Sequence, residues 1–136
     1  SKSIGQIINN EGGCALIIDY GDWHSLGSTL QAVKSHKVAK IFDRPGEVDL
    51  TCHVDFEALA RSSGCAYSKL TTQGVFLERL GISDRANLLL KNSKPEYKNS
   101  IISAHRRLTH PDEMGTLFKV LGLFPKDQNS PAGLVR

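Results

Sequence analysis

The stretch CALIIDYGD, residues 14–22, decides the fold prediction. Its first five residues are apolar without alternation, and the run stops at two carboxylates that flank an aromatic residue and a glycine. A continuous apolar run favours a strand covered on both faces, as in a parallel sheet. A helical apolar pattern at 4–8 precedes the strand and ends before Gly12 and Gly13. Helix, glycine turn and buried strand make half of a βαβ unit, so the sequence predicts an α/β fold.

The clearest helix signal after this strand begins at Asp55, which suits the N-cap. Val54 and Leu59 can form a hydrophobic staple around it, and Gly64 suits the left-handed position that ends the helix. His105 lies on the apolar face of a later helix, where a core or boundary histidine is favoured over a ligand. Strands are expected at 29–33, 37–42, 67–72 and 117–124, with a turn at 44–46. Helices are expected at 75–80 and, capped by Ser83, at 83–91. A capping box at 93–96 opens the later helix, and the tail after residue 125 is expected to be loose.

The composition is that of an ordinary soluble globular domain. The 136 residues are enough for one domain with one core, with 40% hydrophobic and 23% charged residues. Seventeen Lys and Arg against fourteen Asp and Glu leave a formal charge of +3. This small, scattered excess favours solvated faces over a nucleic-acid-binding surface. No apolar run reaches the ~20 residues of a membrane span, and no signal peptide is visible.

No metal site is expected from the cysteines or histidines. Cys14, Cys52 and Cys65 are odd in number and lack zinc-finger spacing, which favours reduced, mostly buried thiols. His53 and Asp55 lie two positions apart, a weak ligand spacing for zinc. The sequence also contains no P-loop, no Gly-x-Gly-x-x-Gly and no Ser-His-Asp elbow.

The polar end of the 14–20 strand is the first candidate site. In open α/β sheets, ligands bind beyond the carboxyl ends of the parallel strands. Asp19 and Asp22 could accept hydrogen bonds from a cationic or amide substrate beside Tyr20, and Gly21 would allow a sharp turn or a close approach. The alternative is that Asp19 merely caps the next turn.

The second candidate site is the segment 49–55, DLTCHVD, which gathers acids, a hydroxyl and an imidazole before a helix. A helix N-terminus with His53 nearby could bind an anion or move a proton, with Thr51 and Asp55 beside it. The alternative gives Asp55 only a capping role and leaves His53 exposed.

Five stretches taken together carry a family resemblance. They follow one another over nearly the whole chain as GGCALIIDYG (12–21), TLQAVKSH (29–36), PGEVDLTCHVDF (45–56), TTQGVFLERLGI (71–82) and MGTLFKVLGL (114–123). This set resembles the C-terminal part of the MidA family, S-adenosylmethionine-dependent methyltransferases of mitochondria and bacteria. One position departs from the family pattern, since Ser28 stands where an acid is expected.

The resemblance implies a Rossmann-like class I methyltransferase sheet with inserted helices. It makes 14–20 the fifth strand, 55–63 the following helix, 67–72 the sixth strand and 117–124 the antiparallel seventh. The cofactor loop belongs to the first strand, which would lie N-terminal to residue 1. Residues 1–136 are therefore expected to be the C-terminal, substrate-side part of the domain, and the chain, which starts without Met, is expected to be a fragment.

The resemblance also implies partners and a compartment. The cofactor is S-adenosyl-L-methionine, bound mainly outside this chain, and the substrate is a protein arginine, in mitochondria that of a complex I core subunit. The expected compartment is the mitochondrial matrix in a eukaryote and the cytoplasm in a bacterium. The open edge of a half-sheet would be covered by the N-terminal half or another chain. The alternative is a non-catalytic interaction fragment. The implied substrate-side residues are Asp19, Tyr20, Gly21, Thr51, His53, Asp55 and Gln73.

Overall fold

The computed structural model describes residues 1–35, 37–42 and 45–136, and it confirms the α/β prediction. Its helices are α1 (Lys2–Glu11), α2 (Phe56–Ser63), α3 (Gln73–Arg79), α4 (Ile82–Asn92), α5 (Pro95–Thr109) and the π-helix η1 (Pro111–Gly115). Its strands are β1 (Ala15–Asp22), β2 (Gln31–Lys34), β3 (Lys37–Ala39), β4 (Asp49–Thr51), β5 (Val54–Asp55), β6 (Ala66–Tyr67), β7 (Thr71–Thr72) and β8 (Phe118–Phe124).

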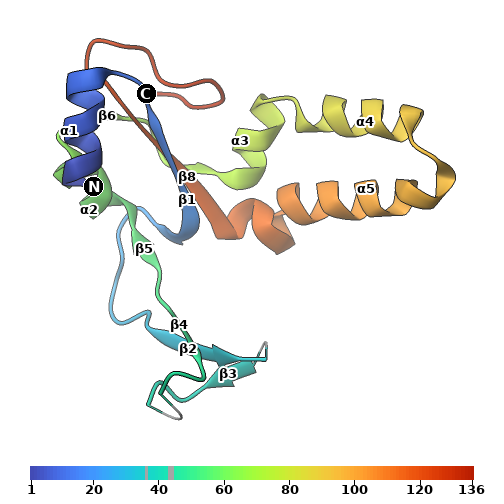
Figure 1. The fold of residues 1–136 in the computed structure, drawn as a ribbon, viewed down its shortest axis with the longest axis horizontal. Coiled ribbons are helices and arrows are strands. Elements are labelled where there is room, and N and C mark those ends of the chain that lie inside the picture. The colour runs from blue at the N-terminus through green and yellow to red at the C-terminus, as the bar shows by residue number, and fades with distance from the viewer. Residues whose placement is uncertain (36, 43–44) are drawn as a thin grey trace.

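The main sheet is centred on β1 and β8, in the order β5-β1-β8-β6, with β7 also paired to β8 (Figure 1). β8 runs antiparallel to β1, from Ala15 opposite Leu123 to Tyr20 opposite Phe118. It is antiparallel to β6 and β7 as well, whereas β1 and β5 are parallel. The strand at 117–124 was expected to be antiparallel, and β8 confirms this prediction.

One face of the sheet is covered by α1 and α2 (Figure 1). Phe56, Leu121 and Leu123 are fully buried there, and Ile8 of α1 joins them. Each such side chain contributes about 1.5–3 kcal/mol of burial free energy. Ile17 of β1 packs against this cluster from the sheet. The apolar run of β1 therefore anchors both helices.

The helix expected at 55–63 forms as predicted. Asp55 is the N-cap, and Gly64 follows α2 in the left-handed region, with φ 73°. Val54 and Leu59 both pack against the α1–α2 core, and a direct staple contact between them stays a prediction. The signals at the two ends of the helix are local in sequence, and the structure confirms both.

The strand predicted at 67–72 is divided into β6 and β7 by a break at Ser68. Ser68 is 1% exposed, and its N–H donates to the carbonyl of Gly122 at 2.9 Å. Its Oγ accepts the N–H of Gly122 at 3.0 Å, in place of a main-chain carbonyl. The N–H of Lys69 donates instead to the carbonyl of Val135 in the C-terminal tail, at 2.8 Å. A serine side chain thus keeps β8 bonded through the break.

The other face of β1 is only partly covered. Leu16 and Ile18 remain 45% and 46% exposed, because the apolar cluster on this face consists of Phe76, Val120 and Leu134, which pack over β8. The prediction of a strand buried on both faces is therefore wrong for β1 in this chain. Among the described residues, β1 pairs only with β8 from Ala15 to Tyr20. Its other edge gains a partner at Gly21 and Asp22, which pair with β5.

Two substructures project from the main sheet (Figure 1). The first is a small antiparallel sheet in the order β3-β2-β4. The strands expected at 29–33 and 37–42 do pair, as β2 and β3. The third strand, β4, was not predicted, because the segment 49–55 was expected to lead directly into a helix. The second is a hairpin of α4 and α5, neither of which has a fully buried residue. The turn predicted at 44–46 lies partly outside the described residues.

The caps predicted for the projecting hairpin are wrong. α4 begins after Gly81, while Ser83 Oγ bonds to Glu78 (2.8 Å) and contacts His105 Nε2 (3.1 Å). Ser83 is therefore used by tertiary partners that local sequence does not reveal. The His105 side chain is 29% exposed, which confirms a boundary histidine.

The capping box predicted at 93–96 does not form either. The N-cap of α5 is Lys94 and receives no side-chain bond, although Pro95 does occupy the first turn. Ser93 ends α4 in an extended conformation, and its Oγ is buried without a hydrogen-bond partner among the described residues. The tight turn between the two helices thus draws this side chain inward, away from the first turn of α5.

The C-terminal tail and the cysteines also differ from expectation. Leu134 is 6% exposed against Phe76 and Val120, so the tail is packed and not loose. Cys14 and Cys52 are exposed and only Cys65 is buried; all three are free thiols. None of the helices in the described part of the chain is long and apolar enough to cross a membrane.

Candidate functional site

The carboxyl end of β1 lies at Asp22, two residues beyond the predicted end at Tyr20. Gly21 and Asp22 continue the strand by pairing in parallel with Val54 and Asp55. A Cβ on Gly21 would lie 2.2 Å from the carbonyl oxygen of Val54, and the φ of Gly21 is 156°. Glycine is therefore needed here for the close approach of β1 to β5, not for a turn.

Asp19 lies inside β1, three positions before the end of the strand. Its Oδ1 accepts the N–H of Tyr20 at 2.8 Å. Its register partner is Lys119, whose Nζ donates to the carbonyl of Thr116 at 2.7 Å and forms no ion pair with Asp19. Side chains alternate along a strand, so Asp19 and Tyr20 leave β1 on opposite faces. The substrate role of Asp19 stays a prediction.

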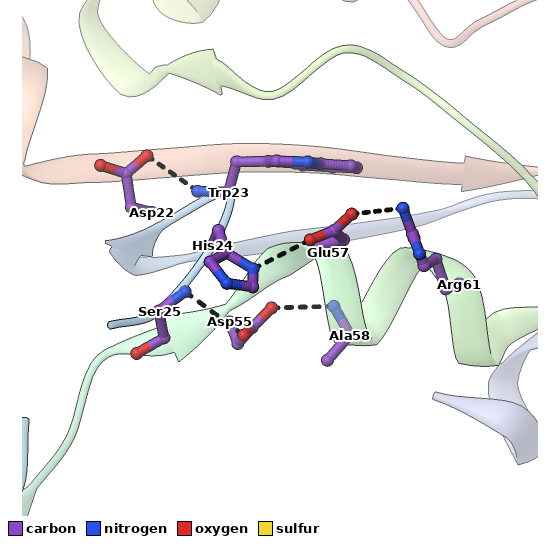
Figure 2. A network of polar contacts seen from close by, with 8 residues as sticks. All are labelled: Asp22, Trp23, His24, Ser25, Asp55, Glu57, Ala58 and Arg61. Carbon is purple, nitrogen blue, oxygen red and sulfur yellow. Dashed lines mark hydrogen bonds and ion pairs between the residues drawn. The ribbon is translucent and has the colours of Figure 1, made fainter. Parts of the chain in front are cut away.

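Asp55 caps α2 and also holds the loop that follows β1 (Figure 2). Its Oδ1 accepts the N–H of Ala58 at 2.9 Å, and its Oδ2 accepts the N–H of Ser25 at 3.3 Å. These two bonds, the stronger from Ala58, together with the nearby His24, hold the pKa of Asp55 below its ordinary value. Because both oxygens are engaged, the geometry gives Asp55 a structural role first.

Glu57 is the centre of a second polar network at the same point (Figure 2). Its Oε2 lies 3.0 Å from His24 Nδ1, and its Oε1 lies 2.5 Å from Arg61 Nη2. Its N–H donates to the carbonyl of Trp23 at 2.8 Å. The Glu57 side chain is 19% exposed and that of His24 is 62% exposed. The loop after β1 is thus tied to the first turn of α2 by main-chain and side-chain bonds.

The sequence prediction missed His24, Glu57 and Arg61. Glu57 and Arg61 are four positions apart on one helix, a pairing that the sequence could have revealed. The contact of His24 with Glu57 could not have been found in this way, because it depends on the parallel register of β1 and β5.

Tyr20 and His53, one from each candidate site, lie in contact. Their ring centroids are 5.9 Å apart in an edge-on arrangement, and Tyr20 makes a similar contact with Phe118 at 5.8 Å. The N–H of His53 donates to Thr29 Oγ1 at 3.0 Å, and His53 itself is exposed. Thr51, half-buried, ends β4 two residues earlier. The segment 49–55 therefore does meet the end of β1.

Gln73 lies apart from this group in its contacts. It is 7% exposed, and its Nε2 donates to the carbonyl of Leu108 at 2.9 Å. This bond ties the start of α3 to the end of α5. The structure thus gives Gln73 a supporting role at the base of the projecting helices, and its predicted contact with substrate has no geometric support.

The end of β1 can accept hydrogen bonds from a cationic group. Asp22 Oδ1 accepts the N–H of Trp23 at 2.8 Å, as Asp19 Oδ1 does from Tyr20. In the described part of the chain, the second carboxylate oxygens of Asp19 and Asp22 bond to no other group. No group of three or more His, Cys, Asp or Glu side chains among the described residues could hold a metal ion. The arrangement suits recognition of a cation near an aromatic ring.

Comparison with known proteins identifies relatives over most of the chain. Residues 1–76 match the family model described as "Putative S-adenosyl-L-methionine-dependent methyltransferase". The chain is 38% identical over 122 residues to the mitochondrial protein arginine methyltransferase NDUFAF7 homolog of Drosophila melanogaster, covering 87% of the chain and 28% of that protein. It is 32% identical over 127 residues to the mitochondrial protein arginine methyltransferase NDUFAF7 of Homo sapiens, covering 91% of the chain and 29% of that protein. The chain thus spans less than a third of these relatives.

Two crystal structures from Burkholderia thailandensis share the fold. An uncharacterized COG1565 superfamily protein aligns with a TM-score of 0.78 and 27% identity, over 91% of this chain and 36% of its own. A COG1565 superfamily member and likely methyl transferase bound to S-adenosyl-homocysteine aligns with a TM-score of 0.75 and 27% identity, over 89% of this chain and 34% of its own. The order of the strands and the parallel pairing of β1 with β5 agree with the family match. The chain therefore belongs to this family of S-adenosyl-L-methionine-dependent methyltransferases.

Proposed function

We propose that residues 1–136 form the C-terminal, substrate-side part of a methyltransferase that transfers a methyl group from S-adenosyl-L-methionine to a protein arginine. Family membership supports the reaction class, and the names of the curated relatives support arginine as the acceptor. Leu16 and Ile18 are half-exposed on one face of β1. This exposure supports the proposal that another part of the protein packs against that face.

The observation that carries the proposal is the carboxylate of Asp22 at the end of β1, on the same face of the strand as Tyr20 two positions earlier. Asp19 and Asp22 each keep a carboxylate oxygen that no group in the described chain engages, and Tyr20 lies between them in sequence. A carboxylate can bind a guanidinium through two parallel N–H···O bonds, a geometry that a lysine ammonium does not offer. An aromatic ring beside it favours a cation further. Asp22, beside Tyr20, is therefore proposed to orient the acceptor arginine, and Asp19 is proposed to contact the substrate from the opposite face of β1.

Methyl transfer from a sulfonium requires the arginine nitrogen to lie in line with the S–CH3 bond. As the N–CH3 bond forms, the S–CH3 bond would break, S-adenosyl-homocysteine would leave, and the nitrogen would give up one proton to solvent. The bound cofactor would supply the electrophilic methyl group. This chain would supply orientation. The carboxylate of Asp22 would hold the guanidinium plane, and the first turn of α2 holds the loop after β1 in place through Asp55 and Glu57. The glycine-rich cofactor loop is proposed to lie in the N-terminal part of the domain.

The remaining members of the predicted site are assigned by their contacts. His53 is proposed to flank the substrate through its contact with Tyr20, and Thr51 to line the same approach. Gly21, Asp55 and Gln73 are proposed to act by positioning. The resemblance and the mitochondrial relatives lead us to propose a complex I core subunit as the protein substrate in the mitochondrial matrix, if the source is a eukaryote. A bacterial form would act in the cytoplasm.

The test is a methyl-transfer assay on the full-length protein with S-adenosyl-L-methionine carrying a tritiated methyl group. Mitochondrial or bacterial membrane extracts serve as substrate, and acid hydrolysis identifies the labelled amino acid. The proposal expects labelled methylarginine. Label on another amino acid would contradict the substrate class. A full-length protein that binds partner proteins but transfers no label would favour the alternative of a non-catalytic interaction protein.

A further inference from the structure

A cavity of about 660 Å³ lies beside β6, between the loop that follows β1 and the C-terminal tail. This volume is within the range of small-molecule sites, roughly 300–1,000 Å³. The residues that line it are Trp23, Cys65, Ala66, Tyr67, Ser68, Lys69, Leu70, Lys126 and Arg136. Apart from Trp23, none of them belongs to the networks that connect β1 to α2. The cavity is therefore a feature that the proposed methyl transfer does not use.

Two aromatic side chains form a wall of this cavity. The rings of Trp23 and Tyr67 are 5.9 Å apart at their centroids and inclined by 37°. The Trp23 side chain also packs against the apolar core beneath α1 and α2, and this contact fixes the position of the indole ring. Tyr67 is 38% exposed, although it lies on a paired strand. Such a wall suits a planar apolar group, which gains contact area with little ordering of the protein.

Three cationic side chains, of Lys69, Lys126 and Arg136, also line the cavity. The Arg136 guanidinium lies 6.0 Å from the centroid of the Phe124 ring, and its Nη1 donates to the carbonyl of Lys126 at 3.4 Å. Within the described part of the chain, none of the three forms an ion pair with a carboxylate. All three residues are exposed to solvent. Cationic side chains along an apolar cavity favour an anion over a cation.

We propose that this cavity binds a small aromatic carboxylate, with its ring against Trp23 and Tyr67 and its carboxylate at Lys69, Lys126 and Arg136. The apolar lining selects the body of the ligand, and the cations select its charge. A nucleotide fits less well, because the polar edges of a base would meet the apolar side chains of Ala66 and Leu70. The proposal is independent of the proposed methyl transfer, since it rests only on this cavity.

The chain contains one tryptophan, so Trp23 gives a single indole N–H signal in a ¹⁵N-labelled sample. The 136-residue chain is titrated with 4-phenylbutyrate, with its neutral amide and with the corresponding amine. The carboxylate is expected to move the Trp23 signal saturably. The neutral amide is expected to bind about tenfold more weakly, because it keeps the ring contact and loses the charge contacts. The cationic amine is expected to cause no saturable shift.

Variants separate the charge contacts from the fold. The double change Lys126→Gln with Arg136→Gln is expected to weaken carboxylate binding about tenfold and to leave amide binding unchanged. Lys91→Gln, on the exposed end of α4, is the matched control and should bind both probes as the unaltered chain does. Tyr67→Ala should weaken both probes alike. Equal affinity for carboxylate and amide, or a double variant that binds the carboxylate normally, would overturn the proposal.

Discussion

Gly21→Ala tests whether close contact between β1 and β5 requires a glycine. The new Cβ would lie 2.2 Å from the carbonyl oxygen of Val54 and 2.7 Å from its nitrogen, and both atoms belong to the main chain. No rotamer change can relieve this overlap, so the two strands must separate. Overpacking of this kind costs about 1–3 kcal/mol, and the φ of 156° adds about 1 kcal/mol for alanine. We expect a total loss of about 3 kcal/mol in the free energy of unfolding.

Gly13→Ala is the matched control for the backbone contribution. Gly13 has φ 87°, but a Cβ there would meet no atom within 4 Å. This variant should lose only about 1 kcal/mol, because it carries the backbone cost without the steric overlap. Urea unfolding followed by Trp23 fluorescence measures both, and the difference of about 2 kcal/mol corresponds to a midpoint shift of about 1 M. If both variants lose the same stability, the packing argument at Gly21 is wrong.

Three further changes test the interior and the α2 cap. Asp55→Asn should reduce the stability that the chain loses between about pH 5 and pH 2. Folding lowers the pKa of Asp55, so the ionised carboxylate stabilises the fold at any pH above the ordinary pKa. This stabilisation disappears as the pH falls through the folded pKa. Equal acid losses by urea unfolding would contradict this. Ser68→Ala should cost about 1–3 kcal/mol by leaving the buried N–H of Gly122 unpaired, whereas Ser100→Ala, on the surface of α5, should change stability by less than about 0.5 kcal/mol. Leu134→Ala should cost about 2–4 kcal/mol in thermal or urea unfolding if the tail is packed; a loss below about 0.5 kcal/mol would indicate a loose tail.

Local signals predicted the structure well where the partners are close in sequence. Asp55 and Gly64 act at the two ends of one helix, and the structure confirms both roles. The cap predicted at Ser83 failed because Glu78 and His105, from neighbouring helices, engage the hydroxyl instead. Tertiary partners of this kind leave no periodic trace in the sequence.

The residues of the candidate site could be predicted only in part, because some of them are brought together by partners that are distant in sequence. The abrupt polar end of an apolar stretch marked Tyr20 and Asp22, which do lie at the end of β1, and His53 contacts Tyr20 there. The parallel register of β1 and β5 then decides which residues meet, and it brings in His24 and Glu57, which no motif had marked. The exposed face of β1 could not be predicted from the sequence, because a continuous apolar run reflects how the strand is buried in the whole protein and not in one part of it.

The most direct test of the central claim is the kinetics of the full-length protein with Asp19→Asn, Asp22→Asn and both changes together. Asn keeps the shape of the side chain and one acceptor oxygen but removes the charge that would hold a guanidinium. The account predicts that the double variant binds S-adenosyl-homocysteine in calorimetry as the unaltered protein does. Its kcat/KM for the protein substrate should fall at least about tenfold, a loss of about 1.4 kcal/mol in transition-state stabilisation. Asp84→Asn, on exposed α4, is the control and should change neither quantity. Unchanged methyl transfer by the double variant would contradict the claim that the end of β1 holds the acceptor arginine.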